Sequence, residues 1–175
     1  AMGERRPTEF NRGGANMCEH EAHVAEMLGR TIIGERAWDI SKTIDALAYF
    51  SECDLDKIAL TGNSGGGTAT YYGACFDERI KIAMPDCAFC NYEDSIMNFY
   101  HCSCNYIPHA YEWFEMQDLA CLIAPRILVS MSGAKDEIFP MHGVKKGFKT
   151  IEAIYAQENA TGNCRQVFST KGHYW

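Results

Sequence analysis

The chain has 175 residues, enough for one domain with a hydrophobic core, and its 47% apolar and 22% charged residues are ordinary for a globular protein. A formal net charge of −7 argues against a nucleic-acid partner, because no basic stripe is present to neutralise phosphates. No apolar run approaches the ~20 residues that a membrane span requires.

The nine cysteines are odd in number and scattered along the chain, without the spacing of a disulfide framework. This usage favours a reducing compartment. We therefore expect a cytoplasmic protein whose cysteines are mostly buried, reduced thiols.

In chain order, the polar residues 1–14 contain a proline and a Gly-Gly pair, which predicts a loop. Helical spacing of apolar residues predicts helices at 18–28 (with Gly29 as its cap), 35–50 and 143–158. Short apolar runs predict buried strands at 57–61, 80–84, 126–130 and 165–168. Because strands and helices alternate, we expect an α/β fold with a mostly parallel sheet and helices on both faces.

Residues 86–122 lack a clean period and are rich in aromatic residues and cysteines. We expect an insertion between strands, part loop and part short helix, that lies over the strand ends and covers the pocket. Its aromatic residues either stack on a ligand or fill the core of the insertion: Phe89, Tyr92, Phe99, Tyr100, Tyr106, Tyr111, Trp113 and Phe114.

A G-x-S-x-G motif, Gly62 to Gly66, joins the strand at 57–61 to a segment that continues as a helix through Cys75. A sharp strand-to-helix turn of this kind lifts the hydroxyl of Ser64 above the sheet edge and directs the helix N-terminus at developing negative charge. Glycines two residues to either side avoid clashes with the strand and helix. The motif favours a nucleophile over an incidental serine in a glycine-rich turn.

A serine nucleophile needs a general base, and the base needs an acid that orients it. Asp136 follows the strand at 126–130, and His173 follows the strand at 165–168. Both therefore belong at the carboxyl edge of the sheet, where Ser64 also lies. We predict Ser64 as nucleophile, His173 as base and Asp136 as acid.

Other titratable residues are weaker candidates. Asp86 also ends a strand and is the alternative acid, whereas Glu137 is expected to point elsewhere on a tight loop. His142 is expected at the pocket wall or the surface. The histidines expected to have no catalytic role are His20, His23, His101 and His109.

With these motifs in view, the chain resembles the α/β-hydrolase superfamily, and more narrowly its acetyl-xylan-esterase-like and dienelactone-hydrolase-like branch. The matching stretches are GER at 3–5, TGNSGGG at 61–67, FDERIK at 76–81, CSCNYIP at 102–108, LIAPR at 122–126, GAKDEIFP at 133–140 and GH at 172–173. The resemblance implies a serine esterase that needs no cofactor and cleaves small acyl esters, acetyl groups on carbohydrate among them. Gly65 would then supply one oxyanion-hole amide.

The chain departs from that family pattern at both ends. The family carries several strands before this region, with a loop that donates the second oxyanion amide, and Gly13-Gly14 is the sole candidate for that loop here. The sequence also ends two residues after His173. We therefore expect residues 1–175 to form a single but partial hydrolase domain that lacks the N-terminal strands.

Two alternatives to an esterase remain open. One is a structural zinc held by four cysteines of the insertion, with His101 and His109 nearby. Those four are Cys87, Cys90, Cys102 and Cys104. We favour reduced thiols and no metal, because a C-x-C spacing is tight for a zinc knuckle. The other is a non-catalytic protein of the same fold, against which the presence of Ser64, Asp136 and His173 argues.

Overall fold

The computed structural model describes residues 17–174, so the predicted loop at 1–14 and the Gly13-Gly14 pair lie outside the described residues. The α-helices are α1 (Met17–Met27), α2 (Ile32–Leu47), α3 (Gly65–Phe76), α4 (Ala110–Trp113) and α5 (Met141–Gln157). The 3₁₀ turns are η3 (Leu55–Lys57), η4 (Ser103–Asn105), η5 (Met116–Leu122) and η6 (Thr161–Asn163). The strands are β1 (Ile58–Asn63), β2 (Ile80–Asp86), β3 (Ile127–Gly133) and β4 (Cys164–Ser169).

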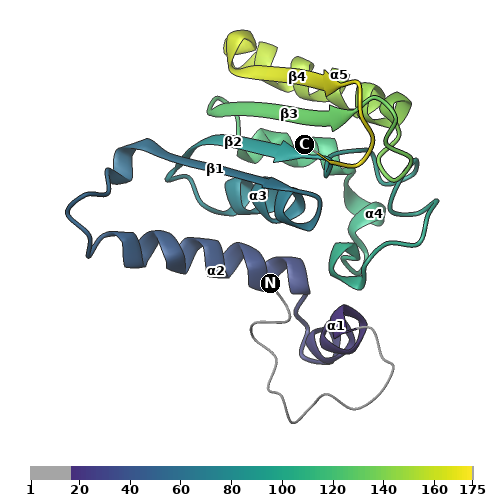
Figure 1. Ribbon diagram of the computed structural model, residues 1–175, viewed down its shortest axis with the longest axis horizontal. Helices are drawn as coiled ribbons and strands as arrows, with labels where there is room; N and C mark the ends of the chain where they lie inside the picture. The colour runs from purple at the N-terminus through teal and green to yellow at the C-terminus, as the bar shows by residue number, and fades with distance from the viewer. Residues whose placement is uncertain (1–16, 175) are drawn as a thin grey trace.

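The four strands form one parallel sheet in the order β1-β2-β3-β4. Figure 1 shows them side by side with their arrowheads at the same edge. The predicted parallel α/β sheet is confirmed, and each strand overlaps its predicted range. Their carboxyl ends therefore bring the loops after β1, β3 and β4 together, as the site requires.

Capping residues decide where the first two helices begin and end. Gly29 has a φ of +68° and closes α1, while the Arg30 amide donates to the Ala25 carbonyl at 2.8 Å. Thr31 caps α2, because its Oγ1 accepts from the Gly34 amide at 3.1 Å. This cap starts α2 three residues before the predicted residue 35.

The helices that contact the sheet lie in one layer. α3 packs on β1 and β2, α5 packs on β3 and β4, and both contact η5. Strand side chains that point toward this layer are buried, such as Leu128, whereas those of the opposite face are partly open, with Ile127 38% and Val167 42% exposed. Among residues 17–174, helices therefore cover one face, and the predicted helices of the second face are not found in this part of the chain.

Between β2 and β3 the chain is irregular and is interrupted by η4, α4 and η5. The first part of this segment is buried, with Phe89 and Tyr92 in the main core beside Tyr71 and Phe148. No helix within residues 17–174 has the length and apolar character to cross a membrane.

Candidate active site

Ser64 occupies the turn between β1 and α3 in a strained backbone conformation, with φ 53° and ψ −121°. A non-glycine residue rarely adopts a positive φ, and such residues cluster at functional sites. Its amide donates to the Asp86 carbonyl at 2.9 Å and its carbonyl accepts from the Thr68 amide at 2.8 Å, so both neighbours hold the turn in place.

Two glycines make this turn possible. A Cβ on Gly62 would lie 2.5 Å from the carbonyl carbon and oxygen of Gly66, and a Cβ on Gly67 would lie 2.5 Å from the Asp86 carbonyl oxygen. A Cβ on Gly66 would meet nothing within 4 Å. The predicted need for glycine is therefore met at Gly62, but on the helix side it falls on Gly67 and not on Gly66, because residue 67 faces the end of β2.

The structure brings together the three residues that the sequence singled out. Ser64 Oγ lies 2.7 Å from His173 Nε2, and His173 Nδ1 lies 2.8 Å from Asp136 Oδ2. In the neutral imidazole that donates its Nδ1–H to the carboxylate, Nε2 is free to accept the serine proton. This is a continuous chain of hydrogen bonds from hydroxyl to carboxylate.

Asp136 is well suited to orient the imidazole. Its side chain is fully buried, and its second oxygen, Oδ1, accepts from the amides of Ile138 at 2.9 Å and Phe139 at 3.1 Å. Burial alone would raise the pKa of Asp136, but the hydrogen bonds from His173 and from the two amides outweigh it and lower the pKa below its ordinary value. The carboxylate therefore stays ionised beside His173.

Aromatic neighbours fix the imidazole of His173. The Phe139 ring stacks on it at 5.7 Å between centroids with a 13° interplanar angle, and His101 packs against the edge of Phe139 at 5.3 Å. Burial, followed by the nearby His173, lowers the pKa of His101, whose Nε2 lies 3.2 Å from Ser95 Oγ. The sequence analysis assigned His101 no catalytic role, and its place in an aperiodic insertion offers no signal for one.

The other candidates lie outside this hydrogen-bonded chain. Asp86, the alternative acid, accepts from Asn63 Nδ2 at 2.6 Å. Glu137 is exposed, as are the remaining histidines of the described chain: His20, His23, His109 and His142. His142 pairs with Asp94 at 3.3 Å at the start of α5.

A pocket of about 240 Å³ opens onto Ser64 and His173. The Gly65 amide belongs to the first turn of α3, whose amides have no partner within the helix, so it is available to a ligand. Arg36 of α2 also lines the pocket, and its Nη1 lies 3.5 Å from where a Cβ of Gly65 would be. The sequence analysis did not single out Arg36. Its only signal was a charged residue next to Ile33 and Ala37, which lie on the buried face of the amphipathic helix α2.

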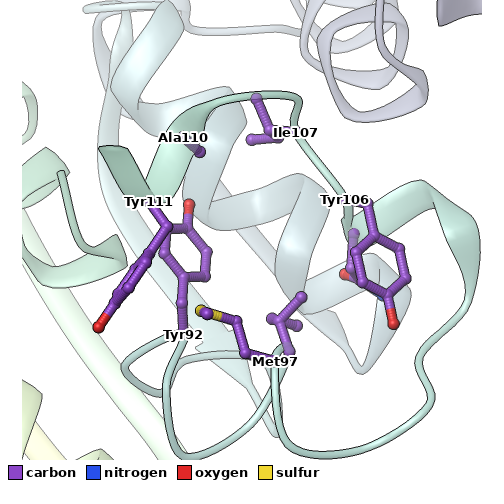
Figure 2. Close-up of a pocket in the computed structure, with 8 residues that line it drawn as sticks. Tyr92, Met97, Tyr106, Ile107, Ala110 and Tyr111 are labelled. Carbon is purple, nitrogen blue, oxygen red and sulfur yellow. The ribbon is translucent and has the colours of Figure 1, made fainter. Parts of the chain in front are cut away.

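A second, smaller cavity of about 90 Å³ lies within the insertion. Figure 2 shows Tyr92, Met97, Tyr106 and Tyr111 around it, and Asn105 borders both this cavity and the larger pocket. Phe89 is 1% exposed and belongs to the core, so the ligand-stacking alternative fails for that residue. Tyr100 lines the larger pocket.

The four cysteines of the alternative zinc site do not converge. Cys87 Sγ lies beside Asp136 and His173, where burial raises its pKa to about 12, and Cys90 Sγ lies 3.5 Å from Asn91 Oδ1. Within the described residues, Cys102 and Cys104 group with Cys18 of α1 instead. This alternative ligand set is therefore wrong, because two of its members, Cys87 and Cys90, belong to the core beside β2.

Solved esterase structures match this chain in fold, and the chain has the α/β-hydrolase fold. The superfamily resemblance of the sequence is thereby confirmed for the fold. A glucuronoyl esterase mutant from Sporotrichum thermophile, in complex with methyl 4-O-methyl-β-D-glucopyranuronate, matches with a TM-score of 0.69 at 18% identity. That match covers 81% of this chain and 46% of the esterase.

Two further comparisons likewise cover most of this chain but only part of the matched protein. Methylesterase BT1017 matches with a TM-score of 0.67 at 23% identity, over 83% of this chain and 33% of its own. In sequence, the chain is 30% identical over 158 residues to the Bacillus subtilis (strain 168) protein named "Putative hydrolase YtaP". That alignment covers 85% of this chain and 52% of YtaP, so the chain spans about half the length of this relative. No protein-family model matches the sequence.

Proposed function

We propose that the protein is a serine esterase in which Ser64, His173 and Asp136 form a catalytic triad. The observation that carries this proposal is the pair of short contacts, 2.7 Å from Ser64 Oγ to His173 Nε2 and 2.8 Å from His173 Nδ1 to Asp136 Oδ2. The positive φ of Ser64 and the buried carboxylate of Asp136 also support it. Both features cost stability, and costly features of this kind cluster at functional sites.

In the proposed reaction, Ser64 Oγ attacks the ester carbonyl while His173 Nε2 takes the hydroxyl proton. His173 then returns that proton to the departing alcohol, leaving an acyl-enzyme that water hydrolyses by the same route. Asp136 holds the imidazole tautomer and stabilises the imidazolium. The Gly65 amide, at the positive end of α3, binds the oxyanion together with a second donor.

We further propose a carbohydrate ester as the substrate. In the ester bound to one glucuronoyl esterase, methyl 4-O-methyl-β-D-glucopyranuronate, the sugar forms the acyl part. In an acetylated carbohydrate, the sugar forms the alcohol part. A pocket of about 240 Å³ beside Ser64 has room for a small acyl group such as acetyl. Tyr100 at its wall is placed to contact a sugar ring.

The test compares hydrolysis of p-nitrophenyl acetate, longer acyl p-nitrophenyl esters and a methyl glucuronate by the full chain. We expect activity that falls with acyl length, and a loss of ~10⁴-fold or more in Ser64→Ala, with the fold intact by circular dichroism. Ser103→Ala, in η4 beside the pocket, is the matched control and should keep its activity. Hydrolysis by Ser64→Ala within ~10-fold of wild type would remove Ser64 from the mechanism.

A further inference from the structure

Three sulfur atoms converge on one side of the catalytic pocket. The Sγ atoms of Cys18, Cys102 and Cys104 all lie within 4.8 Å of one another. Cys18 comes from α1, more than eighty residues before the other two along the chain. The fold therefore assembles the group from segments that are far apart in sequence.

The turn η4 and its N-cap residue present Cys104 and Cys102 on the same side. The Asn105 amide donates to the Cys102 carbonyl at 2.9 Å, and Asn105 Nδ2 donates to the same oxygen at 3.2 Å. These bonds close a tight turn around Ser103, so the two sulfurs of the C-x-C pair can reach one ion. Cys104 is 3% exposed.

A guanidinium borders the sulfur group. Arg36 Nη1 donates to Cys104 Sγ at 3.4 Å. Three thiolates and one Zn²⁺ carry a net charge of −1, and the charge of Arg36 neutralises it. Zinc bound at ~2.3 Å from each sulfur separates the sulfurs by ~3.8 Å, which the observed spacing accommodates with little movement.

We propose that Cys18, Cys102 and Cys104 form a zinc site that clamps α1 onto η4. The three thiolates supply three of the four ligands that tetrahedral zinc takes. Because Cys102 and Cys104 also line the pocket that holds Ser64, the ion forms part of the pocket wall. The site is independent of the proposed esterase chemistry.

The packing of α1 gives the ion a structural task. The buried cluster that joins α1 to the rest of the chain consists of Ala22, Ala25, Ile32 and Cys104, with Cys102 against it. Two alanines bury little apolar area, so α1 has a weak hydrophobic anchor. A thiolate–zinc bond to Cys18 supplies the missing stabilisation, as structural zinc does in small domains.

The test measures zinc bound per chain in protein purified with a thiol reductant. We expect about one zinc ion in wild type and in the control Cys121→Ser, whose cysteine is exposed on η5, and less than about a tenth of that in Cys18→Ser. Thermal unfolding of Cys18→Ser should no longer respond to a chelator, whereas wild type should be destabilised by it. Equal zinc contents in the three proteins would overturn the proposal.

A second measurement needs no variant and so does not depend on how each variant folds. Metal-stripped wild-type protein titrated with Co²⁺ should develop thiolate-to-cobalt charge-transfer absorption in the near ultraviolet, together with the visible bands of tetrahedral cobalt. A titration that develops no charge-transfer absorption would contradict the proposed zinc site. So would a Cys18–Cys102 disulfide mapped in freshly lysed, alkylated cells, because it consumes two of the three ligands.

Discussion

Replacement of Gly133 by alanine tests how tightly the fold positions His173, the proposed general base. Gly133 is the last residue of β3, and a Cβ there would lie 2.8 Å from the Lys171 carbonyl oxygen and 2.7 Å from the Gly172 carbonyl carbon, overlapping the Gly172 oxygen. These atoms are backbone atoms of the loop that carries His173, so a side chain cannot rotate away to relieve the contact. We expect the loop to move by about 1 Å.

A shift of about 1 Å in a reacting group costs about 100-fold in rate, or about 2.7 kcal/mol in the activation barrier. The shift would lengthen the 2.7 Å contact between His173 Nε2 and Ser64 Oγ. The free energy of unfolding should fall by only about 1 kcal/mol, the low end for overpacking, because the loop is at the surface and yields there. Activity is thus lost far more than stability.

The assay is kcat/KM for p-nitrophenyl acetate, with urea unfolding of the same preparations. Gly162→Ala is the matched control, since a Cβ at that position meets nothing within 4 Å, and it should retain both properties. If Gly133→Ala kept kcat/KM within about threefold of wild type, the reasoning from loop position to rate would be refuted.

Asp136→Asn should lower activity less than Ser64→Ala, because the base survives with the wrong tautomer, and a larger loss in Asp86→Asn than in Asp136→Asn would contradict the assigned acid. The lowered pKa of Asp136 stabilises the fold above the ordinary aspartate pKa, and this contribution is lost as pH falls through the folded pKa. Urea midpoints below about pH 4 should therefore fall more steeply in wild type than in Asp136→Asn; parallel profiles would speak against the linkage. Residues 1–175 expressed alone should self-associate, because β1 is an edge strand in the part of the chain that the structure describes, and a cooperatively unfolding monomer by size exclusion would disprove this.

The backbone arrangement was accessible from sequence because its signals are local. Apolar runs located the four strands, and the order of Ser64, Asp136 and His173 after successive strands placed them at one sheet edge. In a parallel sheet, the loops that follow the strands all lie at the same edge, so residues at the ends of successive strands come close together. The cap at Thr31 was equally local, yet it was overlooked, which shifted the start of α2.

Contacts between side chains distant in sequence were not accessible in this way. Nothing in the spacing of Cys18 indicates that it meets Cys102 and Cys104, because that meeting depends on how α1 packs on η4. The preference for Gly67 over Gly66 as the tight position likewise depends on where the end of β2 passes α3. The single-faced helical layer follows from the strand order β1-β2-β3-β4, because right-handed crossovers that step in one direction across a sheet place their helices on the same face.

The central claim is that His173 activates Ser64 as a nucleophile, and covalent labelling tests it most directly. A fluorophosphonate probe should modify the peptide that contains Ser64, and the labelling should be lost in His173→Ala but retained in His142→Ala, whose histidine side chain is 72% exposed at the start of α5. An unlabelled Ser64, or equal labelling rates in wild type and His173→Ala, would contradict the account.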